Sequence, residues 1–148
     1  MTSVVRTVDV PVDPGEAFRL FTDEIDDWYV RGRWSWNDPE RAVAIRFEPG
    51  VGGRLVEVWD AETGEGYEMG RVLAWEPGRR VAWSFRNVHM QADGTVVDVR
   101  FQPSGAGTRV TLEHSGLEVL PPDELERTRE RAWLPVVRAF ADYAGSRR

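Results

Sequence analysis

The side chain best placed to do chemistry is the carboxylate of Glu57, which lies in an apolar stretch. Leu55, Glu57 and Trp59 alternate along it and would share one face of a strand. If that face lines a cavity, the carboxylate could orient a ligand or act as a general base. The alternatives are a solvent-facing strand or a neutralising arginine. A bulge at Gly52-Gly53 would exchange the two faces, so the sequence leaves these alternatives open.

The two histidines are the other candidates for acid–base work. His89 falls within residues 87–93, at or near a hairpin tip, where it could titrate near neutral pH at the rim of a site. An ordinary exposed loop histidine is the alternative. His114 ends a predicted strand before Ser115-Gly116, and we interpret it as a hydrogen-bonded structural residue. The catalytic candidates are therefore Glu57 and His89.

Several kinds of chemistry lack the residues they need. There are no cysteines and only two histidines, so we expect no disulfide, no metal site and no thiol nucleophile. No Ser-His-Asp arrangement is readable, and the glycines of residues 50–53 lack the lysine and following helix of a phosphate loop. We expect no cofactor.

Composition indicates one globular domain spanning residues 1–148. Hydrophobic residues make up 41% and charged residues 30% of the chain. The net charge of -6 disfavours nucleic acid and anionic membranes as partners. No segment approaches the roughly 18 apolar residues of a spanning helix, and the N-terminus does not resemble a signal peptide. We therefore expect a cytoplasmic protein.

Hydrophobic periodicity predicts one strand, a helical segment, six more strands and a long final helix. Asp13 should cap the first helix, with Pro14 in its first turn, and a division of the helix is expected near Thr22-Asp23. Residues 31–41 read as a loop. Because short turns join the later strands, the sheet should be an antiparallel meander. The strands are expected at residues 4–10, 42–48, 54–59, 66–76, 79–86, 95–102 and 108–114.

The Pro77-Gly78 turn allows a register to be predicted for its hairpin. A two-residue loop would pair Glu76 with Arg79, Val72 with Trp83, and Gly70 with Phe85. Alternation then divides the side chains between a core face and an outer face. The core face would carry Val72, Ala74, Val81, Trp83 and Phe85, and the outer face Arg71, Trp75, Arg80, Ser84 and Arg86.

The final helix should start with Asp123 as its cap and Glu126 closing a capping box. Its apolar stripe would hold Trp133 and Phe140, and Pro135 should kink it. One such helix over one curved sheet leaves room for a cavity. The seven tryptophans either pack the interior or line that cavity. The residues expected to contact a ligand there are Trp28, Trp34, Trp36, Leu55, Glu57, Trp59, Trp83, Phe85 and Trp133.

Several stretches resemble the heat-shock-protein-90 ATPase activator-like branch of the START/Bet v 1-like (SRPBCC) superfamily. They are the segments at residues 8–18, 47–54, 70–77, 107–112 and 114–117, the second containing Pro49-Gly50-Val51-Gly52-Gly53, together with Trp28 and Trp133. The resemblance covers nearly the whole chain. It implies an α+β helix-grip fold, in which a curved antiparallel sheet of six or seven strands wraps around a long C-terminal helix. These motifs are turns and core positions, so the resemblance implies architecture more than activity.

Three functions remain open. The first is binding or sequestering a small hydrophobic or aromatic ligand between sheet and helix, with no catalysis. The second is a polyketide cyclase or aromatase-like enzyme, which needs several polar groups aligned on a carbonyl-bearing substrate. The third is a module that binds a chaperone, another protein or a second copy of itself through an exposed apolar patch. We favour the first, because few polar groups are available in the predicted cavity.

Overall fold

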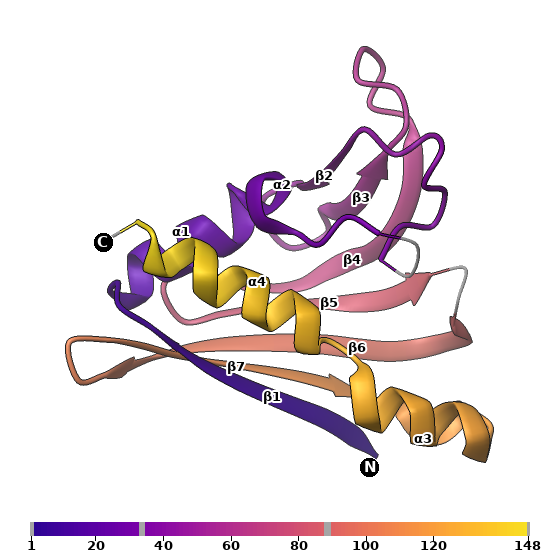
Figure 1. Ribbon diagram of the computed structural model, residues 1–148. Coiled ribbons are helices and arrows are strands. Elements are labelled where there is room, and N and C mark those ends of the chain that lie inside the picture. Colours follow the sequence, from indigo (N-terminus) through magenta and orange to yellow (C-terminus); the bar gives the residue numbers. More distant parts are fainter. Residues whose placement is uncertain (1, 33–34, 88–89, 148) are drawn as a thin grey trace.

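Seven antiparallel strands form one curved sheet in the computed structural model, which describes residues 2–32, 35–87 and 90–147. Of residues 87 and 90–93 it describes the backbone alone. The strands follow the order β1-β7-β6-β5-β4-β3-β2, so each later strand lies beside its predecessor and β1 closes against β7 (Figure 1). The predicted meander is confirmed. Its strands are β1 Ser3–Val10, β2 Ala44–Phe47, β3 Arg54–Val58, β4 Gly66–Glu76, β5 Arg80–Asn87, β6 Met90–Ser104 and β7 Gly107–Ser115.

The β4–β5 hairpin differs from its predicted register because its loop has three residues. Glu76 pairs with Arg80, and Gly78 adopts a φ of 79° in the turn. A bulge at Leu73 absorbs the extra residue, so that Val72 still faces Trp83 as predicted. The predicted pairing of Glu76 with Arg79 is wrong.

The bulge also changes which side chains of β4 face inward. Trp75 pairs with Val81 and packs against Phe18, with ring centroids 5.3 Å apart. Ala74 pairs with Ala82 on the other face. The sequence predicted Ala74 on the core face and Trp75 on the outer face, so both predictions are wrong. A single inserted residue produces this exchange because side chains alternate along a strand.

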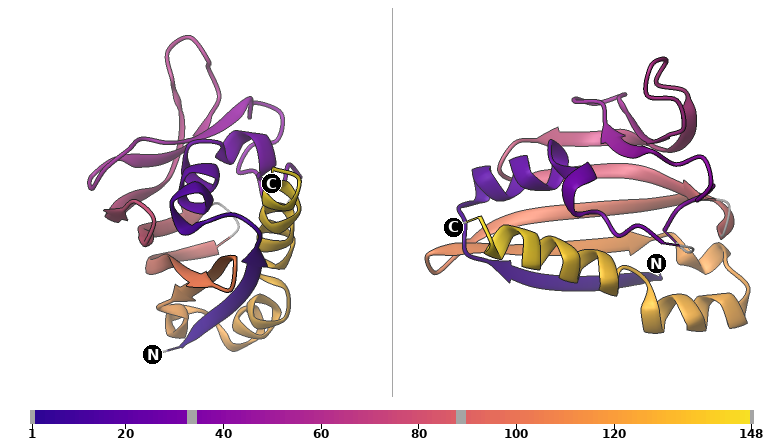
Figure 2. Two further views of the ribbon diagram at one scale, coloured as in Figure 1. Left: turned by 90° about the vertical axis from the view of Figure 1, so that its left-hand side faces the viewer. Right: turned by 45° about the horizontal axis from the view of Figure 1, so that its top comes forward.

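Two short helices follow β1. Helix α1, Pro14–Thr22, begins at Asp13, whose Oδ1 accepts a hydrogen bond of 2.8 Å from the Glu16 backbone N–H. Helix α2, Ile25–Trp28, is a separate turn, so the predicted division near Thr22-Asp23 is confirmed. Both helices lie against the concave side of the sheet (Figure 2).

The C-terminal helical segment is broken rather than kinked. Helix α3 covers Pro122–Arg131 and helix α4 covers Leu134–Gly145, following a 3₁₀ turn at Leu117–Val119. The break places Pro135 in the first turn of α4, where its missing N–H leaves no intrahelical bond unmade. Helix α3 begins from Pro121 without a side-chain cap, so the prediction that Asp123 caps it is wrong.

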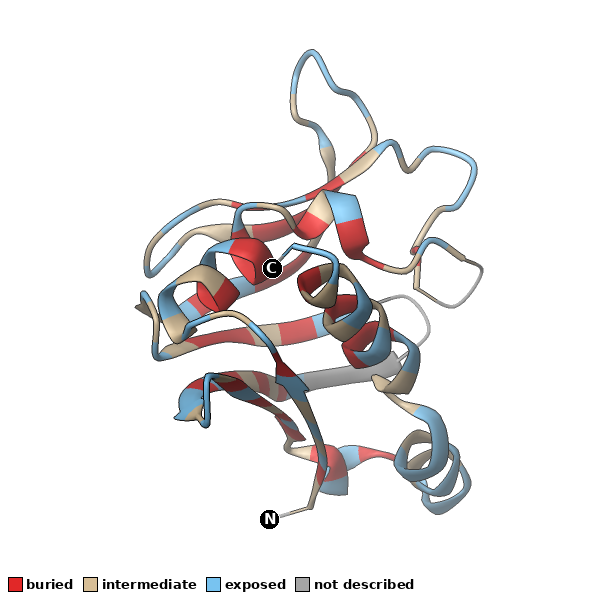
Figure 3. Ribbon diagram, turned by 60° about the vertical axis from the view of Figure 1, so that its left-hand side comes forward, coloured by how far each residue is buried: buried red, intermediate tan, exposed pale blue. Residues whose placement is uncertain are grey.

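The main core lies between the concave face of the sheet and helices α1, α2 and α4 (Figure 3). Phe21 of α1 contacts Phe140 of α4 and Phe101 of β6, with centroid distances of 5.1 and 5.8 Å. Helix α3 contains no buried residue. It lies near the N-terminal end of β1, away from the centre of the sheet (Figure 1).

Candidate functional site

Glu57 is fully buried, with 0% of its surface exposed. Its Oε1 accepts hydrogen bonds from the backbone N–H and side-chain amide of Asn37, at 2.6 and 3.1 Å. Its Oε2 accepts from the backbone N–H of Asp38 at 2.9 Å and from Trp59 Nε1 at 2.8 Å. Both carboxylate oxygens therefore hold the loop before β2.

The aromatic residues around Glu57 connect this loop to the core. The Arg41 guanidinium lies 3.8 Å from the centroid of a Trp59 ring, a cation–π contact. Trp36 is buried and lies 6.2 Å from Tyr29. Burial of the Tyr29 hydroxyl, with a smaller contribution from the Glu57 charge, raises the pKa of Tyr29 above its ordinary value. Tyr29 is therefore neutral at physiological pH.

A second group of rings occupies the concave face near the helix break. This inner cluster consists of Trp83, Phe85, His114 and Trp133. The Trp133 ring lies 5.2 Å from Phe85, 5.8 Å from His114 and 6.5 Å from Trp83, each in an edge-to-face arrangement. Gly70 leaves no room for a side chain beside this cluster, since a Cβ there would lie 1.7 Å from the Ser84 carbonyl oxygen and 3.0 Å from Trp83 Cδ1.

His114 is hydrogen-bonded inside this inner cluster. Its Nδ1 accepts from Trp133 Nε1 at 3.0 Å, and the residue is 0% exposed. Burial lowers the pKa of His114 to about 4, so the ring is neutral at pH 7. The alternation of Val110, Leu112 and His114 along β7 is the sequence signal that places this histidine on the inner face.

The predicted ligand-contacting residues fall into three places. Trp83, Phe85 and Trp133 meet in the inner cluster. Trp28 lies 5.1 Å from Phe140 under α4 and donates its indole N–H to the Leu20 carbonyl at 3.0 Å, while Leu55 is in the same core. Trp36, Glu57 and Trp59 surround the loop before β2. Trp34 and His89 lie outside the described residues.

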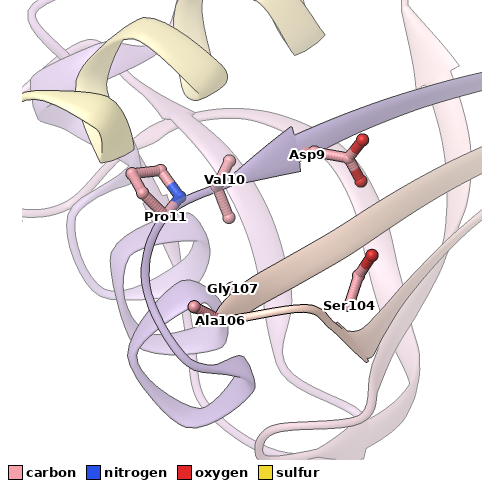
Figure 4. A pocket seen from close by; sticks show the side chains of 6 residues that line it. All are labelled: Asp9, Val10, Pro11, Ser104, Ala106 and Gly107. Atoms are coloured by element: carbon pink, nitrogen blue, oxygen red, sulfur yellow. The ribbon is translucent and has the colours of Figure 1, made fainter.

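An open pocket of about 420 Å³ lies at the C-terminal end of β1, against the β6–β7 hairpin (Figure 4). Asp9, Val10 and Pro11 form one side of it, and Ser104, Ala106 and Gly107 form the other. Its one charged side chain, Asp9, is paired with Arg109 at 3.1 Å. The pocket contains none of the predicted catalytic or ligand-contacting residues.

The described residues contain neither a metal-binding cluster nor a helix that could cross a membrane. Residues 2–32, 35–87 and 90–147 contain no cluster of three or more histidine, cysteine or acidic side chains that could hold a metal ion. Within the same ranges, no helix has the length and apolar character needed to cross a membrane.

The curved antiparallel sheet, the two short helices after β1 and the C-terminal helical segment define a helix-grip protein of the SRPBCC, or Bet v 1-like, class. Within that class, the chain belongs to the "Activator of Hsp90 ATPase homolog 1-like protein" family, whose model matches residues 11–145. The resemblance seen in the sequence is confirmed. No curated protein matches the sequence significantly.

Solved structures support the same fold at low sequence identity. The Aha1 dimer from Colwellia psychrerythraea is 17% identical, with a TM-score of 0.70, and the match covers 98% of this chain and 97% of that one. An AHSA1-like protein from Rhizobium etli is 22% identical, with a TM-score of 0.66 and coverages of 97% and 82%. A protein from Mesorhizobium loti is 21% identical, with a TM-score of 0.65 and 95% coverage of both chains.

Proposed function

We propose that the protein binds a small hydrophobic or aromatic molecule between the concave face of the sheet and the C-terminal helical segment. The observation that supports this proposal is how little of the C-terminal helical segment contacts the inner cluster. Helix α3 has no buried residue, and Trp133 at the break is the residue of this segment in ring contact with Trp83, Phe85 and His114. A small shift of the Trp133 ring that keeps its hydrogen bond to His114 would therefore open an aromatic surface.

Hydrophobic transfer supplies enough free energy for such binding. Burying about 300 Å² of apolar ligand surface would contribute roughly 7–8 kcal/mol before the costs of association. Ordering the ligand and the shifted Trp133 ring reduces that gain. Micromolar dissociation constants are the expected result.

The test combines two measurements. Native mass spectrometry of freshly purified protein should show a co-purified small molecule. Tryptophan fluorescence should titrate saturably with flavonoids and polyketide-like aromatics, and the ligand should be recovered unchanged. The fluorescence response should shrink in Trp133→Phe and persist in Trp59→Phe, because Trp59 lies in the loop-anchoring group around Glu57. Absence of binding across the panel would refute the proposal.

Two other outcomes of this experiment distinguish the alternative functions. Recovery of a cyclised or hydrolysed product, lost in Glu57→Gln, would establish a cyclase or aromatase-like enzyme. Failure to bind any small molecule, together with capture of a chaperone or a second copy of the chain, would establish an interaction module. The Colwellia psychrerythraea relative is described as a dimer, so sedimentation velocity should accompany the titration.

A further inference from the structure

Two buried hydrogen-bond donors on the concave face have no partner. Among the described residues, the buried side-chain atoms without a hydrogen bond are Trp83 Nε1, His114 Nε2 and Asp98 Oδ1. Asp98 pairs with Ala82, next to the Trp83–Val97 pair, so the Asp98 side chain faces the convex side. There its Oδ1 lies 3.4 Å from Arg100 Nε. Both unpaired atoms on the concave face are therefore nitrogens.

The two nitrogens belong to one row of the sheet. Trp83 of β5 pairs with Val97 of β6, and Val97 pairs with His114 of β7, so all three side chains stand on the same face. Strands lie about 4.8 Å apart, which separates the backbones of Trp83 and His114 by about 10 Å. The small Val97 lies between them, and the Trp133 ring contacts both outer residues.

The hydrogen bond from Trp133 settles which His114 nitrogen is the donor. Trp133 Nε1 donates to Nδ1, so Nδ1 is an acceptor. The neutral imidazole then carries its proton on Nε2, which is the unpaired atom. A buried N–H without an acceptor is unfavourable, and native proteins generally fill such a position with an oxygen atom.

The charge around these donors favours an uncharged acceptor. Burial lowers the pKa of His114 to about 4, so the imidazole supplies no positive charge at pH 7. Arg6, on the same face of β1, donates to the carbonyls of Ala132 and Arg129 at 3.0 and 2.6 Å and so caps the end of α3. A carboxylate placed here would have no free cation among these groups, and burying it unpaired would be costly.

We infer that the inner cluster binds a flat aromatic ketone or a related uncharged carbonyl compound, whose oxygen accepts hydrogen bonds from His114 Nε2 or Trp83 Nε1. The aromatic walls of Trp83, Phe85 and Trp133 hold the rings of the ligand. This inference rests on the proposed function and adds to it the chemical class of the ligand.

Three matched two-ring probes test the inference on the unmodified protein. They are 1-acetylnaphthalene, 1-ethylnaphthalene and 1-naphthoate, which present a ketone, a hydrocarbon and a carboxylate on one scaffold. The ketone should bind about threefold to tenfold more tightly than the hydrocarbon, as expected for one net hydrogen bond. The carboxylate should bind most weakly.

Nuclear magnetic resonance shows where the preference arises. The indole N–H signal of Trp83 or the Nε2–H signal of His114 should move downfield with the ketone and not with the hydrocarbon. At least one of the variants Trp83→Phe and His114→Phe should lose the preference for the ketone over the hydrocarbon. Trp28→Phe is the matched control and should keep it, because the Trp28 indole N–H is already bonded to the Leu20 carbonyl.

The outcomes separate this inference from the proposed function. If ketone and hydrocarbon bind equally well, or the carboxylate binds best, the ligand class is wrong while binding of aromatic molecules stands. If no naphthalene binds, the inference fails, and the broader ligand panel decides the proposed function. Should the variants not fold, the probe series and the spectra of the unmodified protein still decide.

Discussion

At the residue scale, His114 shows how one buried side chain joins the sheet to the helical layer. It accepts a hydrogen bond from Trp133 through Nδ1 and packs its ring against Phe85 at 4.9 Å. Protonation of Nδ1 would abolish that acceptor and place a charge in an aromatic environment. The neutral form of His114 is therefore part of the folded state.

We expect the stability of the protein to fall between pH 6.5 and pH 4 because of His114. The pKa of this residue is about 4 in the folded chain, against an ordinary value of 6.5. Between these values the unfolded chain binds a proton that the folded chain does not, so acid favours unfolding. The loss amounts to roughly 3 kcal/mol below pH 4. Urea denaturation at several pH values measures it.

His114→Gln is the control for this prediction, because glutamine does not titrate in the range. Its stability should change less than that of the unmodified protein between pH 6.5 and 4. Parallel pH profiles for the two proteins would show that His114 is not the group responsible.

Glu57 acts at the same scale as an anchor for the loop before β2. Glu57→Gln keeps its shape but turns an NH₂ group toward N–H donors, leaving at least two of the four hydrogen bonds unmade. Hydrogen bonds to charged groups contribute about 1.5–3 kcal/mol each. We expect a loss of about 3 kcal/mol in chemical denaturation, with faster proteolysis of residues 35–43.

The exposed residue Glu62 provides the comparison for this substitution. Glu62→Gln should change stability by less than about 0.5 kcal/mol, as usual for surface positions. An equally small effect for Glu57→Gln would mean that its hydrogen bonds do not hold the loop.

At the element scale, the break between α3 and α4 depends on the backbone of Trp133. This residue has a φ of 68°, and among described residues other than glycine it alone has a positive φ. A left-handed conformation costs an L-residue roughly 1–2 kcal/mol. The indole packing and its bond to His114 offset this strain, which keeps the ring over the inner cluster.

This strain predicts an unusual order of stabilities at position 133. Trp133→Ala should lose about 3 kcal/mol through the lost ring contacts, and Trp133→Gly should be more stable than Trp133→Ala by about 1 kcal/mol. Arg138, exposed within α4, is the matched control. There glycine should be less stable than alanine by about 1 kcal/mol. Thermal denaturation of the four variants measures both differences, and the same order at both positions would argue against a strained Trp133.

At the scale of the whole molecule, local stability should follow burial. Helix α3 has no buried residue and is joined to α4 through the strained residue, whereas β5 and β7 lie inside the sheet between paired neighbours. Amide hydrogen exchange should therefore be fast in α3, slower in α4 and slowest in β5 and β7. Protection of α3 equal to that of α4 would show that the two helices open together. An aromatic molecule that binds the inner cluster as proposed should slow exchange around residues 131–135 most.

The sequence by itself determined the order of elements, because each depends on local chemistry. Alternating residues marked the strands, Asp13 capped α1, and the turn glycines separated the strands of the meander. The resemblance of short motifs added the helix-grip fold, since those motifs are turns and core positions that specify architecture.

The tertiary structure alone decided which side chains face the core and which distant residues contact one another. A three-residue loop and the bulge at Leu73 exchanged Trp75 and Ala74 between the two faces, and such register shifts arise from pairing across strands. Glu57 found its donors in Asn37 and Asp38, which lie about twenty positions away in the sequence. The inner cluster formed because β5, β7 and the helix break meet only after folding, and no periodicity within one segment encodes contacts between distant segments.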